Sequence, residues 1–129
     1  MIRIEHAALW TRDLERSRAF YERYFGASAG PLYENQGTRF ASYFLRFGSG
    51  ARLELMHRSD DEVGRAIQGP APACGHLAFA VGSEDAVDDL TRRLRADGHA
   101  AVDGPRRTGD GYYESVVLDP DGHRIEITV

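Results

Sequence analysis

Two histidine and glutamate pairs are the residues in this chain whose types and spacing could do chemistry. Glu54 lies between two leucines in ARLELM, and Glu126 lies between two isoleucines in GHRIEITV. A charged side chain among aliphatic neighbours is seldom buried unless it is paired or bound to a metal. His6 precedes Glu54 by 48 residues, and His76 precedes Glu126 by 50. The nearly equal spacing indicates a repeated unit that brings the four side chains to one place.

The chemistry available to these four side chains is metal binding. Two imidazoles and two carboxylates form a mixed nitrogen and oxygen site for one divalent metal. No thiolate takes part, so an open site that keeps positions for water or substrate is favoured over a closed structural zinc site. We expect nickel, cobalt or zinc, with manganese and iron as alternatives, because all tolerate a six-coordinate site of this kind.

The first half of the chain supplies the elements that must position the first pair. Residues 3–11 alternate as a strand does, and a helix follows between an N-cap at Asp13 and a terminating glycine at Gly26. Residues 40–47 and 51–56 read as two strands joined by a glycine-rich hairpin. The loop before them, residues 27–37, has room for one more short strand.

The second half repeats this order after a stretch, residues 60–73, that has no sustained period and is taken as a linker. Its predicted elements are a strand over 75–81, a helix over 84–96 with Ser83 as N-cap, a turn-rich connection over 102–111, and strands over 112–118 and 124–129. The period of two places each histidine and its glutamate on the face opposite the bulky aliphatic residues. We expect small or polar side chains to line that face as a cavity wall, while the aliphatic face packs on the helix.

Composition excludes several other functions. A chain of 129 residues with 42% hydrophobic residues can fold as one domain, and no apolar run is long enough to cross a bilayer. The net charge of -4 argues against a nucleic-acid partner. All sixteen basic residues are arginine, so lysine chemistry is excluded. The single Cys74 fits a reducing compartment, and we expect a cytoplasmic protein.

The other histidines and the cysteine are weaker candidates. His57 and His123 adjoin strand ends and His99 follows a helix, so we expect all three to be exposed. Cys74 has no CxxC partner and is read as a small loop or core residue rather than a nucleophile.

The whole chain resembles the glyoxalase I branch of the vicinal oxygen chelate superfamily. The resemblance rests on HAALWTRDLERSRAFYERYFG, ARLELM, GHLAFAV and LDPDGHRIEI, of which the last is the most specific. It implies an α+β fold of two tandem βαβββ modules, residues 1–58 and 74–129 with a linker over 59–73, whose mixed sheets curve into a cup. His6, Glu54, His76 and Glu126 stand where the family has its metal ligands. The resemblance also implies a homodimer with sites at the subunit interface.

For a member of this branch, the resemblance implies a metal-dependent lyase or isomerase. The metal binds the vicinal oxygens of a small 2-oxo or 2-hydroxy compound or its thiol adduct and stabilises an enediolate, while a carboxylate moves a proton between adjacent carbons. By family analogy Glu126 is the first choice for that base and Glu54 the second.

The resemblance is weaker where the thiol would bind. Glutathione-using members have an arginine four residues after the first ligand and an asparagine four residues after the second, but here these positions hold Trp10 and Arg58. The identity of the thiol, and whether one is used, therefore stays open. We take Trp10, Met56, Arg58 and Tyr113 as substrate-binding candidates, with Trp10 able to stack on a flat or apolar substrate.

Four alternatives come from the same superfamily. Extradiol-type dioxygenases and fosfomycin-type thiol transferases use two histidines and one glutamate, so Glu54 counts against them. Acyl-CoA epimerases use four ligands, commonly with glutamine in place of Glu54. Drug-binding resistance proteins of the bleomycin type keep the cup and lose the ligands, whereas this chain has all four.

Overall fold

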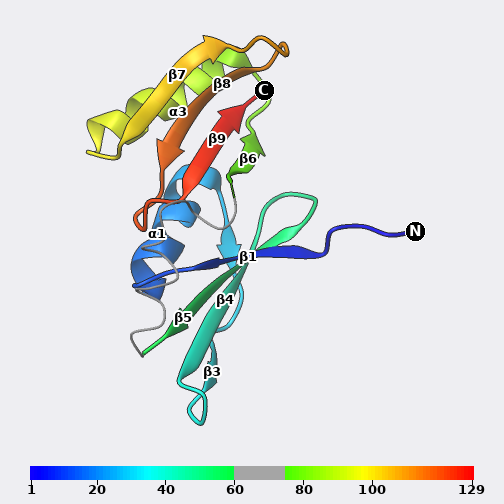
Figure 1. Ribbon diagram of the computed structural model, residues 1–129, viewed down its shortest axis with the longest axis vertical. Helices are drawn as coiled ribbons and strands as arrows, with labels where there is room; N and C mark the ends of the chain where they lie inside the picture. Colours follow the sequence, from blue (N-terminus) through cyan, green and yellow to red (C-terminus); the bar gives the residue numbers. More distant parts are fainter. Residues whose placement is uncertain (60–74) are drawn as a thin grey trace. The chain divides into compact units, whose positions relative to one another are not determined.

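The computed structural model describes residues 1–59 and 75–129, in which the chain forms two compact units, Met1–Ala71 and Pro72–Val129. Each unit has a mixed sheet and, among its described residues, one helix that packs on the sheet (Figure 1). The fold is α+β and is built from two modules, as predicted. Cys74 and nearly all of the predicted linker lie outside the described residues.

The first unit contains one five-stranded sheet and a helix. Its described elements are β1 (His6–Trp10), α1 (Leu14–Phe25), β2 (Ser28–Ala29), β3 (Tyr33–Asn35), β4 (Phe40–Arg46) and β5 (Arg52–Arg58). The sheet runs in the order β1-β5-β4-β2, and β3 also pairs with β4. β1 is parallel to β5, while the β4 and β5 hairpin is antiparallel, as its glycine-rich connection predicts.

Helix α1 begins and ends at the residues that the sequence indicates. The Asp13 side chain accepts a hydrogen bond from the backbone N–H of Arg16, and Gly26 takes the left-handed conformation at φ 66°. The buried side of the helix presents Phe20, Tyr21 and Tyr24 to the unit's core. Leu53 and Leu55 of β5 are buried on the same side, so the helix fixes which face of the sheet is left for the histidine and glutamate.

The second unit repeats the arrangement with four strands. Its described elements are β6 (Leu77–Ala80), α3 (Glu84–Ala96), β7 (Ala101–Arg107), β8 (Tyr113–Leu118) and β9 (Arg124–Thr128). The order is β6-β9-β8-β7, with β6 parallel to β9. Ser83 caps α3 by accepting from the backbone N–H of Ala86, and α3 lies on β7, β8 and β9. Val87, Leu94, Ile125 and Ile127 are fully buried in this layer.

A tyrosine and a carboxylate tie the sheet to the helix in both units. Tyr43 on β4 donates its hydroxyl to Glu15 on α1 at 2.6 Å, and Tyr113 on β8 donates to Asp88 on α3 at 2.7 Å. The hydrogen bond to the carboxylate raises the pKa of each tyrosine above its usual value, with burial as the second cause. Thus the duplication extends beyond the backbone to a specific contact between sheet and helix.

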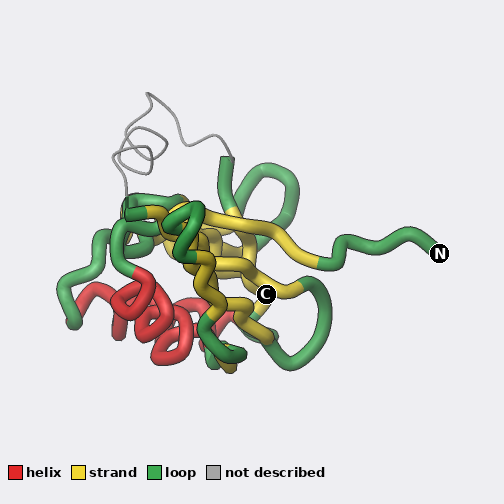
Figure 2. The backbone as a smooth tube through the Cα atoms, turned by 90° about the horizontal axis from the view of Figure 1, so that it is seen from below, coloured by secondary structure: helices red, strands yellow, loops and turns green. Residues whose placement is uncertain are grey.

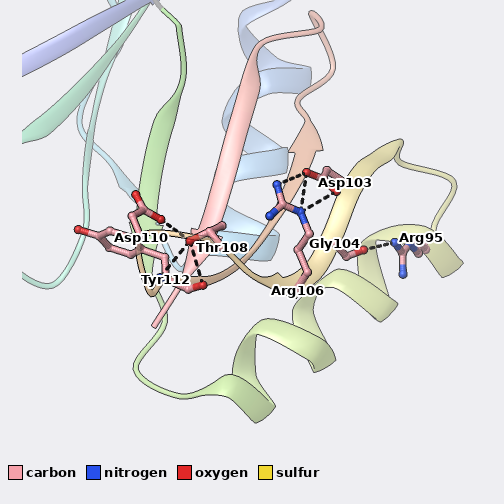
Figure 3. Close-up of polar contacts among 7 residues, drawn as sticks. All are labelled: Arg95, Asp103, Gly104, Arg106, Thr108, Asp110 and Tyr112. Atoms are coloured by element: carbon pink, nitrogen blue, oxygen red, sulfur yellow. Dashed lines mark hydrogen bonds and ion pairs between the residues drawn. The ribbon is translucent and has the colours of Figure 1, made fainter.

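The predicted turn-rich connection over 102–111 was wrong, because most of it forms strand β7. The Gly104 and Pro105 pair suggested a break, but β7 is an edge strand, where proline and bulges are tolerated. Its pairing with β8 is irregular between Ala101 and Arg106, which absorbs the glycine and proline. Figure 3 shows the polar contacts that hold the strand and the turn after it: Arg95 donates to the Gly104 carbonyl at 2.6 Å, Asp103 pairs with Arg106, and Thr108 binds Asp110 and Tyr112.

Other strand predictions were right in position and differ in length. The loop over 27–37 holds two short strands, β2 and β3, where the sequence left room for one. The first strand is shorter than predicted, since β1 begins at His6 and residues 1–5 extend from it as a loop (Figures 1 and 2). Neither helix of the described residues is long and apolar enough to cross a membrane.

Candidate functional site

The first predicted pair lies on neighbouring strands of the first unit. β1 and β5 are in register so that Ala8 is the partner of Glu54, which brings His6, two residues earlier, beside the glutamate. The Nε2 atom of His6 lies 3.7 Å from Oε2 of Glu54. The Glu54 side chain is 15% exposed and that of His6 is 40% exposed. Buried Leu53 and Leu55 hold the backbone on either side of Glu54, so the carboxylate is directed to the opposite face.

The other ring nitrogen of His6 faces Glu5, which is in turn bound by Arg52. Nδ1 lies 2.5 Å from Oε2 of Glu5, while the other carboxylate oxygen of Glu5 accepts from Nε of Arg52 at 2.9 Å and from Nη2 at 2.5 Å. The hydrogen bond with His6, followed by the contacts with Arg52, lowers the pKa of the half-exposed Glu5 carboxyl against an opposing effect of burial. This ring nitrogen therefore faces an ionised carboxylate.

The second unit places its pair in the same register. Ala78 of β6 is the partner of Glu126 on β9, and His76 again lies two residues before that alanine. Nε2 of His76 is 3.2 Å from Oε2 of Glu126, with side-chain exposures of 48% and 20%. Fully buried Ile125 and Ile127 flank this glutamate as the leucines flank Glu54. Both predicted pairs thus come together, by one geometry used twice.

The structure gathers the four predicted ligands as two pairs. In residues 1–59 and 75–129, no three His, Cys, Asp or Glu side chains form a group that could hold a metal ion. Each unit therefore contributes two donors, one nitrogen and one oxygen. A site with all four ligands remains a prediction.

The donor atoms within each pair fit adjacent positions on a divalent metal. Ligand atoms about 2.1 Å from a metal and at right angles to each other lie about 3 Å apart. The two observed separations between Nε2 and the carboxylate oxygen, 3.7 Å and 3.2 Å, are close to that spacing. Imidazole and carboxylate are also a usual ligand combination for transition metals. Each pair can therefore supply two ligands with small side-chain movements.

The surroundings of the two pairs differ. In the first unit, strand β4 places Phe44 opposite Glu54, and its ring meets the His6 ring edge to face at 5.3 Å. The expectation of small or polar residues on this face was wrong for the first unit, where Phe44 of β4 lies on it together with Trp10 of β1 and Met56 of β5. In the second unit the expectation fits β6, which presents Ala78 and Ala80.

An additional carboxylate lies on the site face of the second unit. Glu114 of β8 is two residues from Val116, the partner of Glu126, and so shares the face of Glu126. Burial raises the pKa of Glu114, and the nearby charge of Glu126 raises it further. The alternation of side chains along β8 could have indicated that Glu114 lies on the face opposite the helix. Only the register of β8 with β9 shows that this face is also the face of Glu126.

The four substrate-binding candidates divide into two groups. Trp10, Met56 and Arg58 lie on the face of His6 and Glu54, and the Trp10 ring meets Phe40 edge to face at 6.2 Å. Tyr113 lies on the opposite face of its sheet, where its hydroxyl is bound to Asp88 of α3. The neighbouring residue Glu114, and not Tyr113, shares the face of Glu126. We keep only the first three as candidates.

The weaker candidates have contacts of another kind. Nδ1 of His57 lies 2.9 Å from the backbone carbonyl of Thr11, which indicates a structural role at the end of β5. The backbone N–H of His123 donates to the Asp119 side chain in the turn before β9. The residues that sequence reasoning missed are Glu5, Phe44 and Glu114.

Comparison with known proteins gives one consistent result. Residues 3–127 match the sequence model of the Glyoxalase/Bleomycin resistance protein/Dioxygenase superfamily. A protein of Vibrio cholerae named probable lactoylglutathione lyase is 32% identical, over 97% of this chain and 88% of that protein. The lactoylglutathione lyase of Neisseria meningitidis serogroup A is 30% identical over the same shares of the two chains. The structure of the trypanothione-dependent glyoxalase I of Leishmania major superposes with a TM-score of 0.78 and 25% identity, covering 99% of this chain and 86% of that one.

Proposed function

Because the chain belongs to the Glyoxalase/Bleomycin resistance protein/Dioxygenase superfamily and is a glyoxalase I-like enzyme, we propose that it is a metal-dependent lyase. One divalent metal, with nickel, cobalt or zinc as first choices, is held by His6, Glu54, His76 and Glu126. The observation that carries the proposal is the repeated register: in both units the glutamate is the partner of an alanine two residues after the histidine. The same donor residues in the same strand register in both units support a shared function.

The protein's own residues supply binding and proton transfer. A bound metal would polarise the vicinal oxygens of a small 2-oxo or 2-hydroxy compound and make a neighbouring C–H bond more acidic. Glu126 is the proposed base, which takes a proton from one carbon and returns it to the adjacent carbon. Its side chain is 20% exposed, and the two flanking isoleucines, fully buried on the opposite face of β9, hold this part of the strand in place. Glu54 holds the corresponding place in the first unit and is the second choice.

The proposed substrate is the thiol adduct of a small 2-oxoaldehyde. The names of the curated relatives support an adduct of this kind, and Trp10 with Met56 gives the first unit an apolar wall beside His6. Glutathione is the first thiol to assay. Trp10 stands where the resemblance would place an arginine, so we expect weaker recognition of the charged thiol than in those relatives and a larger share from apolar contact.

The first test is the metal content of protein purified without added metal. Elemental analysis should find one divalent ion for each set of four ligands, and lyase activity should disappear with a chelator and return with the ion. A site that stays empty during titration with Ni²⁺, Co²⁺ and Zn²⁺ would contradict the proposal and favour a metal-free binding protein. Consumption of dioxygen with Fe²⁺ would favour a dioxygenase.

We further propose a homodimer in which one chain gives the first pair and its partner gives the second. His6→Ala and His76→Ala each remove one ligand from every site of a homodimer. A mixed dimer of the two variants would then contain one site with all four ligands and one with two removed. Mixing the inactive variants should therefore restore up to half of the wild-type activity per mixed dimer.

Mixing will restore nothing if each site is built from a single chain. In that arrangement every site in the mixture still lacks one histidine. Sedimentation or light scattering of the wild type measures the dimer independently of activity.

We also propose a cytoplasmic location, supported by a single cysteine in the sequence.

A further inference from the structure

Three side chains of the first unit, from Glu5, Arg52 and Phe44, form a closed circuit of contacts with His6. The ring of His6 touches Glu5 through Nδ1, Glu5 is bound by Arg52, and the Arg52 guanidinium lies over the Phe44 ring at 4.2 Å from its centroid. Phe44 closes the circuit by meeting the His6 ring edge to face. The imidazole therefore has a carboxylate at one nitrogen and an aromatic ring packed against it.

The backbone brings Glu5 and Arg52 together. The backbone N–H of Arg52 donates to the Glu5 carbonyl at 3.0 Å, just before β1 begins, and His6 is the strand partner of Arg52. Neighbouring residues inside a strand point to opposite faces, which would keep Glu5 away from His6. Glu5 precedes the first strand residue, so its side chain is not bound to that alternation and can reach the ring.

The Glu5 carboxylate divides its two oxygens between two partners. Oε1 accepts two hydrogen bonds from Arg52, and Oε2 faces Nδ1 of His6. An ionised carboxylate can only accept, so Nδ1 must carry the proton. In the neutral ring the proton is then absent from Nε2, which is the nitrogen that faces Glu54. The lone pair needed by a metal is thus placed on the correct side of the ring.

The second unit has no equivalent at the same sequence position. His76 follows Gly75, which has no side chain, where His6 follows Glu5. The difference shows that the carboxylate is not a requirement of the strand or of the repeat.

We propose that Glu5, held by Arg52 and Phe44, is a positioning residue that fixes the tautomer and orientation of His6 for metal binding. The inference rests on the proposed metal function of His6. It assigns Glu5 no contact with metal or substrate, and its effect passes through the imidazole. Glu5 is about half exposed, so water can take over part of its hydrogen bonding when the side chain is removed. We therefore expect the loss of metal affinity to be near the lower end of the range for residues that orient a metal ligand.

The tautomer of His6 is measured directly in metal-free protein. Ring ¹⁵N shifts of histidine-labelled protein, recorded at pH 8, should show His6 with its proton on Nδ1. The His6→Gln spectrum identifies the signals. Glu5→Ala should move the ring to a mixture in which Nε2 carries the proton. Glu5→Gln should do the same, because Arg52 competes for the single acceptor oxygen of the amide and leaves its NH₂ group for Nδ1.

Metal affinity is the second measurement. Zn²⁺ titration against a competing chelator should give about tenfold weaker binding for Glu5→Ala than for the wild type. Asp89→Asn is the matched control, since Asp89 is also an exposed carboxylate paired with an arginine, Arg92 on α3, and its loss should change neither readout. Circular dichroism checks that each variant is folded.

The results separate this inference from the proposed function. If the wild type binds no Zn²⁺, the metal proposal fails, while the ¹⁵N shifts still test the contact between Glu5 and His6. If the wild type binds Zn²⁺ and Glu5→Ala keeps both the Nδ1–H tautomer and the full affinity, the role of Glu5 is refuted and the metal proposal stands.

Discussion

The two histidine and glutamate pairs have the same backbone register and different surroundings. The first unit frames its pair with aromatic rings and holds His6 through Glu5, whereas the second unit sets small residues beside its pair and places Glu114 near Glu126. The donor residues are the same in both units, while the neighbouring side chains differ. We infer a division of labour, in which both units hold the metal, the first adds the substrate contacts and the second provides the base.

The largest expected effect comes from changing the two glutamates separately. Glu126→Gln should lower kcat by about 10²- to 10⁴-fold, because it removes the proposed proton carrier. Glu54→Gln should cost less, because the amide oxygen still binds a metal. Steady-state kinetics and exchange of the substrate's C–H proton with deuterated water measure both variants, with metal content as the control. Equal losses in the two variants would contradict the division of labour.

A second comparison concerns the aliphatic residues that flank the glutamates. Leu55→Ala and Ile127→Ala each remove a fully buried side chain on the helix side of the sheet, and each should lower the free energy of unfolding by about 2–5 kcal/mol. Denaturant unfolding measures the loss. If this packing also holds the backbone next to each glutamate, the folded fraction of each variant should bind metal more weakly than the wild type does. The exposed Val102→Ala is a control that should change neither quantity appreciably.

The aromatic wall of the first unit gives a third test. Trp10→Ala removes the ring that meets Phe40 on the face of His6, and it should raise KM about tenfold for the adduct of an aryl 2-oxoaldehyde. For the adduct of methylglyoxal the rise should be smaller, because a methyl group has less surface to contact. Leu32→Ala, at an exposed loop position, should leave both KM values unchanged. An equal rise for the two substrates would mean that Trp10 does not contact the substituent.

The smallest effects are expected from the paired tyrosines, which also give a pH dependence. The raised pKa of Tyr43 and of Tyr113 in the folded protein means that their hydrogen bonds stabilise it fully below about pH 10 and that this contribution is lost as pH rises through the folded pKa. Tyr43→Phe should cost about 0.5–1 kcal/mol. Tyr113→Phe should cost less, because Tyr113 is more exposed.

Unfolding free energies measured from pH 8 to 11 test these tyrosines. The wild type should lose stability above pH 10 more steeply than either phenylalanine variant. If the slope is the same in all three proteins, the hydroxyl contacts do not contribute as proposed.

The sequence predicted the parts of this fold that depend on local chemistry. Asp13 and Gly26 marked the ends of α1, and the glycine-rich hairpin set β4 and β5. The period of two placed each glutamate away from the helix. These features depend on residues close together in the chain, so a single sequence is enough to indicate them.

The features that were missed depend on register or on departures from strand geometry. Phe44 and Glu114 lie on the same sheet faces as the glutamates because of the register in which β4 pairs with β5 and β8 pairs with β9. A single sequence does not specify that register. Glu5 meets His6 only because the strand begins one residue later. Strand β7 was missed because glycine and proline usually interrupt a strand, and only its place at the sheet edge permits them.

The irregularity of β7 also bears on how the protein behaves at high concentration. An edge strand with regular, unpaired N–H and C=O groups can recruit a strand from another molecule and start aggregation. In β7, Pro105 offers no N–H, and the two shifts in pairing with β8 interrupt the regular spacing of its backbone groups. Gly104 and Pro105, which hid β7 from sequence-based prediction, therefore also disfavour the pairing of a strand of another molecule with this edge.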